Sequence, residues 1–276
     1  MKGILLVATN NGYYGQRAYN LAVTIKHKYD IPIALIYNHE GLSHLEERHK
    51  LMFDYLIECP EQYLYPNGVK DKFFIKVNLD KLTPFKKTLY LDADTAWNAH
   101  KDPEELFKKL EGIPFTIANR GYESNYSMWV NVEEIKKQFS IEKYLDCSSE
   151  VMYFESGEVF EKAREVHAIN FNHRKIDASK PDEPCFAIAM ELLEIQPHEL
   201  KWTPAYWYFA KGRTNISRGQ IQNNYFIISA GGAYDSNVKH VEKIYTDYVQ
   251  YAFNLVKEKP FPFIKKSSMI PGRKNY

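Results

Sequence analysis

Short apolar runs alternate with segments of helical periodicity from the first residues of the chain onward. Gly3 to Thr9, Ile31 to Tyr37 and Tyr55 to Ile57 are rich in β-prone apolar residues. Between them, apolar residues recur at helical spacing from Ala18 to Ile25 and again from Leu42 to Met52. This order of strand and helix predicts an α/β fold with a single doubly wound, mainly parallel sheet flanked by helices.

The rest of the chain continues the same pattern. Further strands are expected at Lys87 to about Asp94, Ile113 to Ala118, Ser127 to Val132, Val151 to Phe154 and Tyr225 to Ser229. Asp102 and Pro103 are typical of a helix start, and a long amphipathic helix is expected from Val238 to Val256. The chain has no internal repeat and no dividing linker, so we expect one domain over residues 1–258 and a basic, aromatic tail over residues 259–276.

Charge and cysteine content argue against several classes of protein. Lys and Arg total 36 against 35 Asp and Glu, and the net charge of +1 provides no overall field toward nucleic acid or an anionic membrane. The three cysteines are far apart, which argues against a disulfide framework and a Cys-based zinc site. The apolar run near the N-terminus is too short for a signal peptide or a membrane span. We therefore expect a cytoplasmic protein, with at most peripheral contact with the inner face of the membrane.

The stretch KTLYLDADT, residues 87–95, places two carboxylates directly after an apolar strand. Residues i and i+2 of an extended segment project to the same side, so Asp92 and Asp94 would converge around Ala93. Two such charges repel by roughly 4 kcal/mol at a few ångströms and an effective dielectric near 20, so they require a shared proton, a basic partner or a cation. A bound Mg²⁺ or Mn²⁺ is the simplest way to offset this repulsion. The carboxyl end of a strand is also where open α/β sheets bind ligands. The alternative is an ordinary turn in which one Asp caps and the other is solvated.

This stretch resembles a known family. Tyr90-Leu91-Asp92-Ala93-Asp94-Thr95 is similar to the DxD signature of GT-A fold glycosyltransferases, in particular the glycogenin and bacterial galactosyltransferase group, glycosyltransferase family 8. The other segments that are similar to this group, in the same order, are Val7 to Tyr13, Lys76, Phe154 to Gly157 and Asp182-Glu183. Glu155 stands where the family has Asn, and Glu183 stands where it has Gln. The matches span about residues 3–190.

The resemblance implies a GT-A fold and metal-dependent transfer of a sugar, with retention, from a nucleotide-sugar such as a UDP-sugar to a hydroxyl acceptor. The donor contacts that it implies are Ala8, Thr9, Asn10, Tyr13, Lys76, Asp92, Ala93 and Asp94. It implies that Asp182 and Glu155 orient the sugar or stabilise its developing charge. The alternatives are that the residues after the first strand merely turn the chain and that Asp182 caps a helix.

The metal ligands are only partly matched. Asp92 and Asp94 would bind Mn²⁺ or Mg²⁺, whereas the histidine that completes the family's site falls on Ser229. His240 is the nearest histidine, and it is expected as the third ligand if the Gly231-Gly232 loop folds back. Otherwise water or a donor phosphate completes the coordination shell.

The acceptor is less well specified. Residues 198–224 contain aromatic and basic side chains that suit sugars, bases or phosphates, namely Trp202, Tyr206, Trp207, Tyr208, Lys211, Arg213 and Arg218. The tail has a similar composition, which suits binding to an anionic membrane or to a phosphate backbone. The alternative is that the tail is a frayed end of the chain. A glycan or glycolipid acceptor and a hydroxymethylated DNA acceptor are both compatible, and the near-neutral charge favours the carbohydrate.

Two other classes of protein are considered. A sugar-phosphate nucleotidyltransferase is disfavoured because Asn10 to Arg17 has only two glycines and lacks a Gly-rich phosphate loop. An inactive sugar- or nucleotide-binding adaptor on a transferase fold stays open because of Glu155 and Ser229. The sequence does not specify the oligomeric state.

Overall fold

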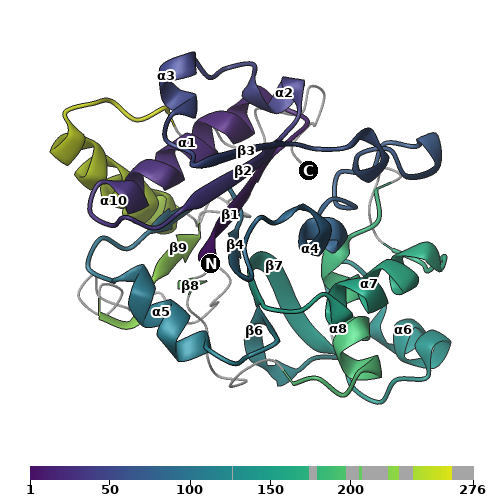
Figure 1. Ribbon diagram of the computed structural model, residues 1–276. Coiled ribbons are helices and arrows are strands. Elements are labelled where there is room, and N and C mark those ends of the chain that lie inside the picture. Colours follow the sequence, from purple (N-terminus) through teal and green to yellow (C-terminus); the bar gives the residue numbers. More distant parts are fainter. Residues whose placement is uncertain (126, 174–178, 197–204, 207–222, 230–238, 263–276) are drawn as a thin grey trace. The chain divides into compact units, whose positions relative to one another are not determined.

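The computed structural model describes residues 1–125, 127–173, 179–196, 205–206, 223–229 and 239–262. Within these residues the main sheet has six strands in the order β3-β2-β1-β4-β7-β6 (Figure 1). These strands are β1 (Lys2–Ala8), β2 (Ile33–Tyr37), β3 (Tyr55–Glu58), β4 (Lys87–Leu91), β6 (Phe115–Glu123) and β7 (Leu145–Phe154). A small sheet in the order β5-β9-β8 is formed by β5 (Thr95–Trp97), β9 (Ile227–Ser229) and β8 (Ala205–Tyr206).

The main sheet has the predicted character. β1 and β4 are parallel neighbours, with Lys2 opposite Lys87 and Leu5 opposite Tyr90. β6 and β7 are antiparallel, so the sheet is mixed but mainly parallel. Most residues of β1, β2 and β4 are buried, as expected for strands that are covered on both faces. The α/β fold that the sequence predicts is therefore confirmed.

Helices occupy the connections between the strands. They are α1 (Gly12–Lys26), α2 (His39–Leu42), α3 (Glu47–Lys50), α4 (Leu79–Leu82), α5 (Pro103–Leu110), α6 (Val132–Phe139), α7 (Glu158–Ala168), α8 (Asp182–Leu192) and α10 (Lys239–Val256), with 3-10 turns η1 (Glu61–Tyr63), η2 (Pro66–Gly68) and η3 (Lys76–Asn78). Asp102 begins α5 as predicted, because its Oδ1 accepts a hydrogen bond from Glu104 N at 2.9 Å. In the described part of the chain, no helix is both long enough and apolar enough to cross a membrane.

Two sequence predictions are wrong. Ser127 to Val132 is not a strand, because Asn131 caps α6 by accepting a hydrogen bond from Glu133 N at 3.1 Å, and only an isolated bridge forms at Val130. The helical pattern from Leu42 to Met52 corresponds to two short helices, α2 and α3, rather than one. In both places a local side-chain cap decides where the helix begins, and apolar periodicity alone does not report it.

Internal contacts divide the chain into two compact units. Unit 1 consists of Met1–Leu5, Ile57–Tyr90 and Leu110–Thr203, and unit 2 consists of Leu6–Leu56, Leu91–Lys109 and Pro204–Tyr276. The core of unit 1 is aromatic, and α7 and α8 lie side by side in it (Figure 1). Phe160 and Phe186 pack edge to face at 5.4 Å between ring centroids, and Phe186 stacks on Phe115 at 5.8 Å. This packing gives α8 a rigid base.

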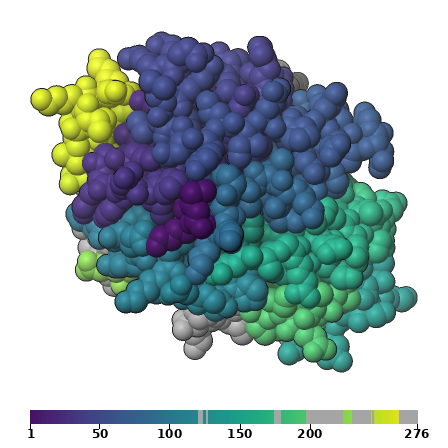
Figure 2. All heavy atoms as spheres, in the orientation of Figure 1, coloured from purple at the N-terminus to yellow at the C-terminus, as the bar shows by residue number. Residues whose placement is uncertain are grey.

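Unit 2 is held together around α1. Thr24 Oγ1 accepts a hydrogen bond from Trp97 N at 2.9 Å, which joins α1 to β5. Asn20 exchanges two hydrogen bonds with the backbone of Phe261, at 2.9 and 3.0 Å, so the segment after α10 returns to α1. The last turns of α10 lie on the surface (Figure 2), and Leu255 is 56% exposed.

Two glycines of unit 2 allow close packing at the end of β1. A side chain at Gly41 would place its Cβ 1.7 Å from the carbonyl oxygen of Ala8. A side chain at Gly15 would place its Cβ 2.3 Å from the carbonyl oxygen of Gly41. Because no Cβ fits at either position, only glycine allows α1 and α2 to pack against the chain as it leaves β1.

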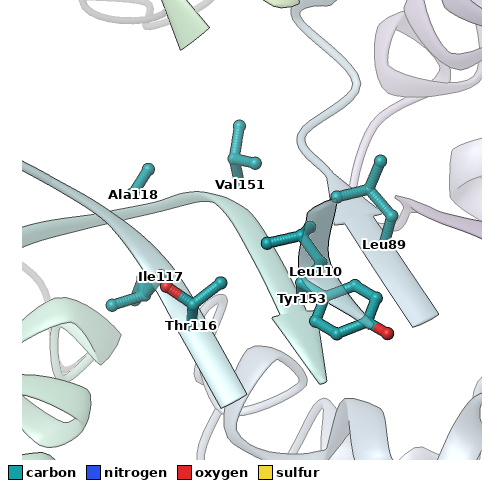
Figure 3. A pocket seen from close by; sticks show the side chains of 7 residues that line it. All are labelled: Leu89, Leu110, Thr116, Ile117, Ala118, Val151 and Tyr153. Carbon is teal, nitrogen blue, oxygen red and sulfur yellow. The ribbon is translucent and has the colours of Figure 1, made fainter. Parts of the chain in front are cut away.

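A small hollow in unit 1 is not a ligand site (Figure 3). Its lining is mainly apolar and consists of Leu89, Leu110, Thr116, Ile117, Ala118, Val151 and Tyr153. It has no room for a water-sized sphere. It is therefore a gap in packing between strand side chains.

Candidate functional site

The two aspartates that follow β4 lie in a tight turn. Thr95 N and Thr95 Oγ1 both donate hydrogen bonds to the carbonyl oxygen of Asp92, at 3.1 and 2.9 Å. The extended backbone expected over Asp92–Asp94 is therefore wrong, because the threonine hydroxyl and amide favour a turn. Asp94 is buried, whereas Asp92 is half-buried. The turn thus places the two carboxylates in different surroundings.

A buried arginine faces Asp94. Arg17 lies in α1, is 4% exposed, and its Nη1 is 3.7 Å from Asp94 Oδ2. Arg17 is therefore the basic partner that was one of the three ways to offset the repulsion between Asp92 and Asp94. This repulsion alone does not require a metal ion. Sequence reasoning missed this residue. The available signal was a charged residue on the apolar face of a helix, four positions before Leu21.

The loop after β1 and the first turn of α1 supply three of the predicted donor-binding residues. Thr9 is buried, and Asn10 and Tyr13 are half-buried. Asn10 has a φ of 69°, in the left-handed region that Asn tolerates better than most residues. Its backbone N–H donates to Asn38 Oδ1 at 3.2 Å, and its Nδ2 donates to Thr9 Oγ1 at 3.0 Å. Because β1 and β4 are parallel neighbours, this loop and the aspartate turn follow the same edge of the sheet.

β9 brings Ser229 beside the aspartate turn. β5 begins at Thr95 and pairs antiparallel with β9, and Ser229 lies opposite Thr95 in this register. The residue that the resemblance aligned with a metal-binding histidine is therefore next to the turn. His240 lies in α10, but its side chain is outside the described residues, so its role as third ligand stays a prediction. In the same helix, burial raises the pKa of Tyr245 well above its ordinary value, and the charges of Arg17 and Asp94 act on it in opposite directions.

We name Thr9, Asn10, Tyr13, Arg17, Asp92 and Asp94 the aspartate cluster. Its carboxylates are the hard oxygen ligands that Mg²⁺ and Mn²⁺ prefer. Ala8 and Ala93, also predicted to contact the donor, are buried. Among residues of described placement, no group of three or more His, Cys, Asp or Glu side chains is arranged to hold a metal. An ion held by Asp92 and Asp94 alone would take its remaining ligands from water and phosphate.

Charge supports this interpretation of the aspartate cluster. Two carboxylates and one guanidinium leave one net negative charge. A diphosphate bound there would add further negative charge in a partly buried place. A divalent ion held by Asp92 and Asp94 would offset it, with Arg17 as a fixed second cation.

A second group of predicted residues meets in unit 1. Lys76 Nζ is 3.8 Å from Asp182 Oδ2, although the two residues are far apart in the sequence. Lys76 Nζ also donates to Ser149 Oγ at 3.1 Å and lies 5.7 Å from the centroid of the Tyr90 ring. The structure therefore brings together two side chains for which the resemblance predicts one site.

Asp182 does not cap α8, although it is the first residue of that helix. The N-cap residue is Pro181, and no side chain caps the helix, so the capping alternative is wrong. Asp182 is 3% exposed, and its Oδ2 makes no hydrogen bond with the described residues. Buried carboxylate oxygens nearly always accept hydrogen bonds, so this oxygen is suited to accept one from a ligand.

Glu183 extends this group. Its Oε2 accepts a hydrogen bond from Trp129 Nε1. Burial raises the pKa of Glu183 to about 7, and the charge of Asp182 also raises it, whereas Trp129 and Lys76 lower it. We name Lys76, Trp129, Ser149, Asp182 and Glu183 the lysine–aspartate cluster. Sequence reasoning did not identify Trp129 or Ser149.

Glu155 has contacts of a different kind. It accepts hydrogen bonds from Tyr153 OH and from Gly112 N, the latter at 3.2 Å. Its Oε1 is 3.8 Å from Nζ of Lys87, the first residue of β4. No described contact joins Glu155 to the lysine–aspartate cluster. Its predicted action on the sugar stays a prediction without a supporting contact.

The residues predicted to contact the acceptor lie mostly outside the described residues. Within residues 198–224, the structure describes only the backbone of Ala205–Tyr206 and residues 223–224. Of the predicted tail, residues 259–262 are described. The proposed roles of these two segments stay predictions.

Comparison with known proteins gives relatives in structure. No protein-family model matches the chain, and no curated protein matches its sequence. The solved structure of the galactosyltransferase LgtC with donor and acceptor sugar analogues has a TM-score of 0.56 and 9% identity, over 91% of this chain and 96% of LgtC. The bifunctional glycosyltransferase WbbM, in its apo form, has a TM-score of 0.56 and 11% identity, over 93% of this chain and 52% of WbbM. Apo GlyE of Streptococcus pneumoniae TIGR4 has a TM-score of 0.51 and 12% identity, over 94% of this chain and 65% of GlyE.

At such low identity these likenesses bear on the fold. All three proteins are described as glycosyltransferases, and the alignments cover nearly the whole of this chain. The mainly parallel six-stranded sheet and its flanking helices match those structures. The chain has the GT-A fold of glycosyltransferases, as the sequence resemblance implies.

Proposed function

We propose that this chain is a glycosyltransferase that moves a sugar from a nucleotide-sugar, with UDP-sugars as the first candidates, to a hydroxyl group of a glycan or glycolipid. The observation that carries the proposal is the Asp92–Asp94 turn, which follows the carboxyl end of β4 in a chain with the GT-A fold. Ligands of open α/β sheets bind at that edge. The structural relatives LgtC, WbbM and GlyE are glycosyltransferases, which supports the same class of activity.

The aspartate cluster is assigned to the nucleotide part of the donor. Asp92 and Asp94 would hold Mn²⁺ or Mg²⁺, which when bound supplies positive charge to the leaving diphosphate. Arg17 holds Asp94 in place and offers guanidinium N–H groups to phosphate oxygens. Asn10 and Tyr13 offer a hydrogen-bonding amide and an aromatic ring to the ribose and base.

The lysine–aspartate cluster is assigned to the transferred sugar. Asp182 Oδ2 accepts a hydrogen bond from a sugar hydroxyl, because no residue of described placement donates one to it. Lys76 stabilises negative charge that develops on the leaving group. In the reaction, the bond from the anomeric carbon to the phosphate oxygen breaks and a bond to the acceptor oxygen forms. The acceptor's proton passes to the departing phosphate, and the resemblance favours retention at the anomeric carbon.

A carbohydrate acceptor is proposed ahead of DNA. The net charge of +1 gives no general attraction to a polyanion. A hydroxymethylated DNA acceptor would require a local basic surface, for which the basic residues between 198 and 224 are the sequence candidates. Transfer assays with glycans, glycolipids and hydroxymethylated DNA separate the two proposals.

Two observations favour a second candidate function. Arg17 already lies beside Asp94, and Ser229 stands at the position of the family's histidine ligand. Both features would suit a protein that binds a nucleotide-sugar without transferring the sugar. This candidate predicts donor binding without turnover.

A combined binding and turnover screen tests the proposal. The protein is mixed with UDP-, GDP-, CDP- and dTDP-sugars, with and without Mn²⁺, and both the melting temperature and nucleotide release are measured. A ligand that binds only the folded state raises its stability by about 2.7 kcal/mol at a hundredfold excess over its Kd. We expect metal-dependent stabilisation and slow release of UDP to water. Stabilisation without release supports the second candidate, and the absence of both with every donor contradicts the proposal.

A further inference from the structure

Two consecutive residues with carboxyl groups, Asp182 and Glu183, begin α8. Asp182 is 3% exposed, and Glu183 is half-buried against the indole of Trp129. Among the described residues, Lys76 is the only basic side chain within ion-pairing distance of Asp182, and Glu183 forms no ion pair. Adjacent buried carboxylates are costly when both are ionised, and one of them is expected to keep its proton.

The groups that face Glu183 from the elements around it also affect whether Glu183 keeps its proton. They are Asp182 on its own helix, Lys76 in η3, Tyr144 just before β7, and Asp146 and Cys147 in β7. Tyr144 and Cys147 stay neutral because burial raises the pKa of each well above its ordinary value. Asp146 is buried, and its charge also raises the pKa of Glu183.

The contacts indicate which of the two groups at the start of α8 carries the proton. Asp182 has the ammonium group of Lys76 at 3.8 Å from its Oδ2. Among the described residues, Glu183 accepts a side-chain hydrogen bond on Oε2 alone, from the neutral N–H of Trp129. Its second oxygen is therefore the one that can carry a hydrogen.

We propose that Asp182 and Glu183 work as a pair that holds one proton, in which Asp182 accepts, and neutral Glu183 donates, hydrogen bonds to hydroxyl groups of the transferred sugar. This inference rests on the proposed function and assigns to it a second sugar-binding group, Glu183. A neutral carboxylic acid has nearly the shape of an amide and, like it, offers one acceptor and one donor direction. The pKa of about 7 that burial and Asp182 give to Glu183 places its loss of a proton near neutral pH.

The first test is the pH dependence of activity in wild type, Glu183→Gln and the control Glu191→Gln, which lies near the end of the same helix. Nucleotide release or sugar transfer is measured with the best donor from the screen. Wild type and the control are expected to lose activity about tenfold per pH unit above about pH 7, because Glu183 then loses its donor proton. Glu183→Gln is expected to keep activity into the alkaline range, because its amide donates at every pH. A folded Glu183→Gln protein that is inactive at every pH, or wild-type activity that rises through pH 7, overturns the proposal.

The second test does not use activity. The folded-state pKa of Glu183, about 7, is above its ordinary value of 4.5, so between these pH values the folded protein holds a proton that the unfolded chain lacks. Raising the pH across this window therefore lowers the melting temperature of wild type relative to Glu183→Gln. Parallel curves for the two proteins overturn the proposal. Diverging curves in a protein that turns over no nucleotide-sugar support the shared proton and overturn the proposed function, so the two failures are distinguishable.

Discussion

Lys76 Nζ lies 3.8 Å from Asp182 Oδ2, so an ammonium and a carboxylate from distant parts of the sequence meet in unit 1. This separation is longer than a hydrogen bond, and Asp182 Oδ2 makes none with the part of the chain that the structure describes. Ser149 holds Lys76 from another direction through a hydrogen bond of 3.1 Å. A structural ion pair of this burial would normally complete its hydrogen bonds within the protein, and this supports our proposal that the pair binds a ligand.

Asp182→Asn is expected to lower sugar transfer by about two orders of magnitude, comparable to the loss of one group that stabilises a transition state. The amide removes the negative charge that faces Lys76 but nearly keeps the shape of the side chain. Steady-state kinetics should show the loss mainly in kcat, with the KM for the nucleotide-sugar changed less. Asp30→Asn, at an exposed position, is the control. A kcat within threefold of wild type would exclude the assigned role.

Arg17→Met is expected to destabilise the metal-free protein by about 3 kcal/mol, because it leaves the buried Asp94 carboxylate without this partner. Mn²⁺ should restore more stability to this variant than to wild type, since the ion then replaces the lost positive charge. Thermal unfolding with EDTA and with Mn²⁺ measures both effects. Equal Mn²⁺ responses in the two proteins would contradict a metal site at Asp94.

Asn10→Gly is expected to weaken UDP binding without destabilising the fold. Glycine adopts the φ of 69° at Asn10 without strain, so the melting temperature should stay close to that of wild type. The variant lacks the amide that hydrogen-bonds Thr9 and that we assign to the donor, so UDP affinity should fall about tenfold, the equivalent of about 1.4 kcal/mol. Unchanged UDP affinity would show that Asn10 only turns the chain.

The sequence predicts the α/β fold and the position of the aspartate turn because strand and helix periodicities are local signals. It also predicts Lys76 and Asp182, through the family resemblance, and the structure brings them together. Arg17 was missed because a sequence does not show which buried charges meet. The partner of a buried arginine depends on packing between elements, in this case between α1 and the turn after β4.

Other errors also have local causes. The expected strand from Ser127 to Val132 does not form because Asn131 caps α6. The extended backbone expected at Asp92–Asp94 is a turn because Thr95 hydrogen-bonds the carbonyl oxygen of Asp92 twice. In each case the hydrogen bonds of one polar residue outweigh the preference of an apolar run for extended backbone.

Asp71→Asn is expected to destabilise the protein by about 2 kcal/mol at neutral pH. Asp71 Oδ2 and His167 Nε2 are 3.0 Å apart, and Phe73 N donates to Asp71 Oδ1 at 2.9 Å. Burial alone would raise the pKa of Asp71, but the hydrogen bonds from His167, Phe73 and Lys180 outweigh it and hold the pKa below its ordinary 3.8. The stabilisation is therefore present above about pH 3.8 and is lost as the pH falls through the lower, folded-state pKa.

Urea unfolding of wild type and Asp71→Asn from neutral pH to about pH 3 measures this difference. The gap in unfolding free energy should be largest near neutral pH and should narrow in acid. A gap that is constant with pH would mean that the Asp71 carboxylate is not stabilised as an anion in the folded protein.

The central claim is that the aspartate turn binds a nucleotide-sugar through a divalent ion, and titration calorimetry of UDP binding tests it most directly. Asp92→Asn is a better variant than Asp94→Asn, because Asp94 also holds the buried Arg17. Wild type should bind UDP at least tenfold more tightly with Mn²⁺ than with EDTA, and Asp92→Asn should bind it equally weakly in both. Equal affinity of wild type and Asp92→Asn, with no effect of Mn²⁺ on either, would contradict the claim.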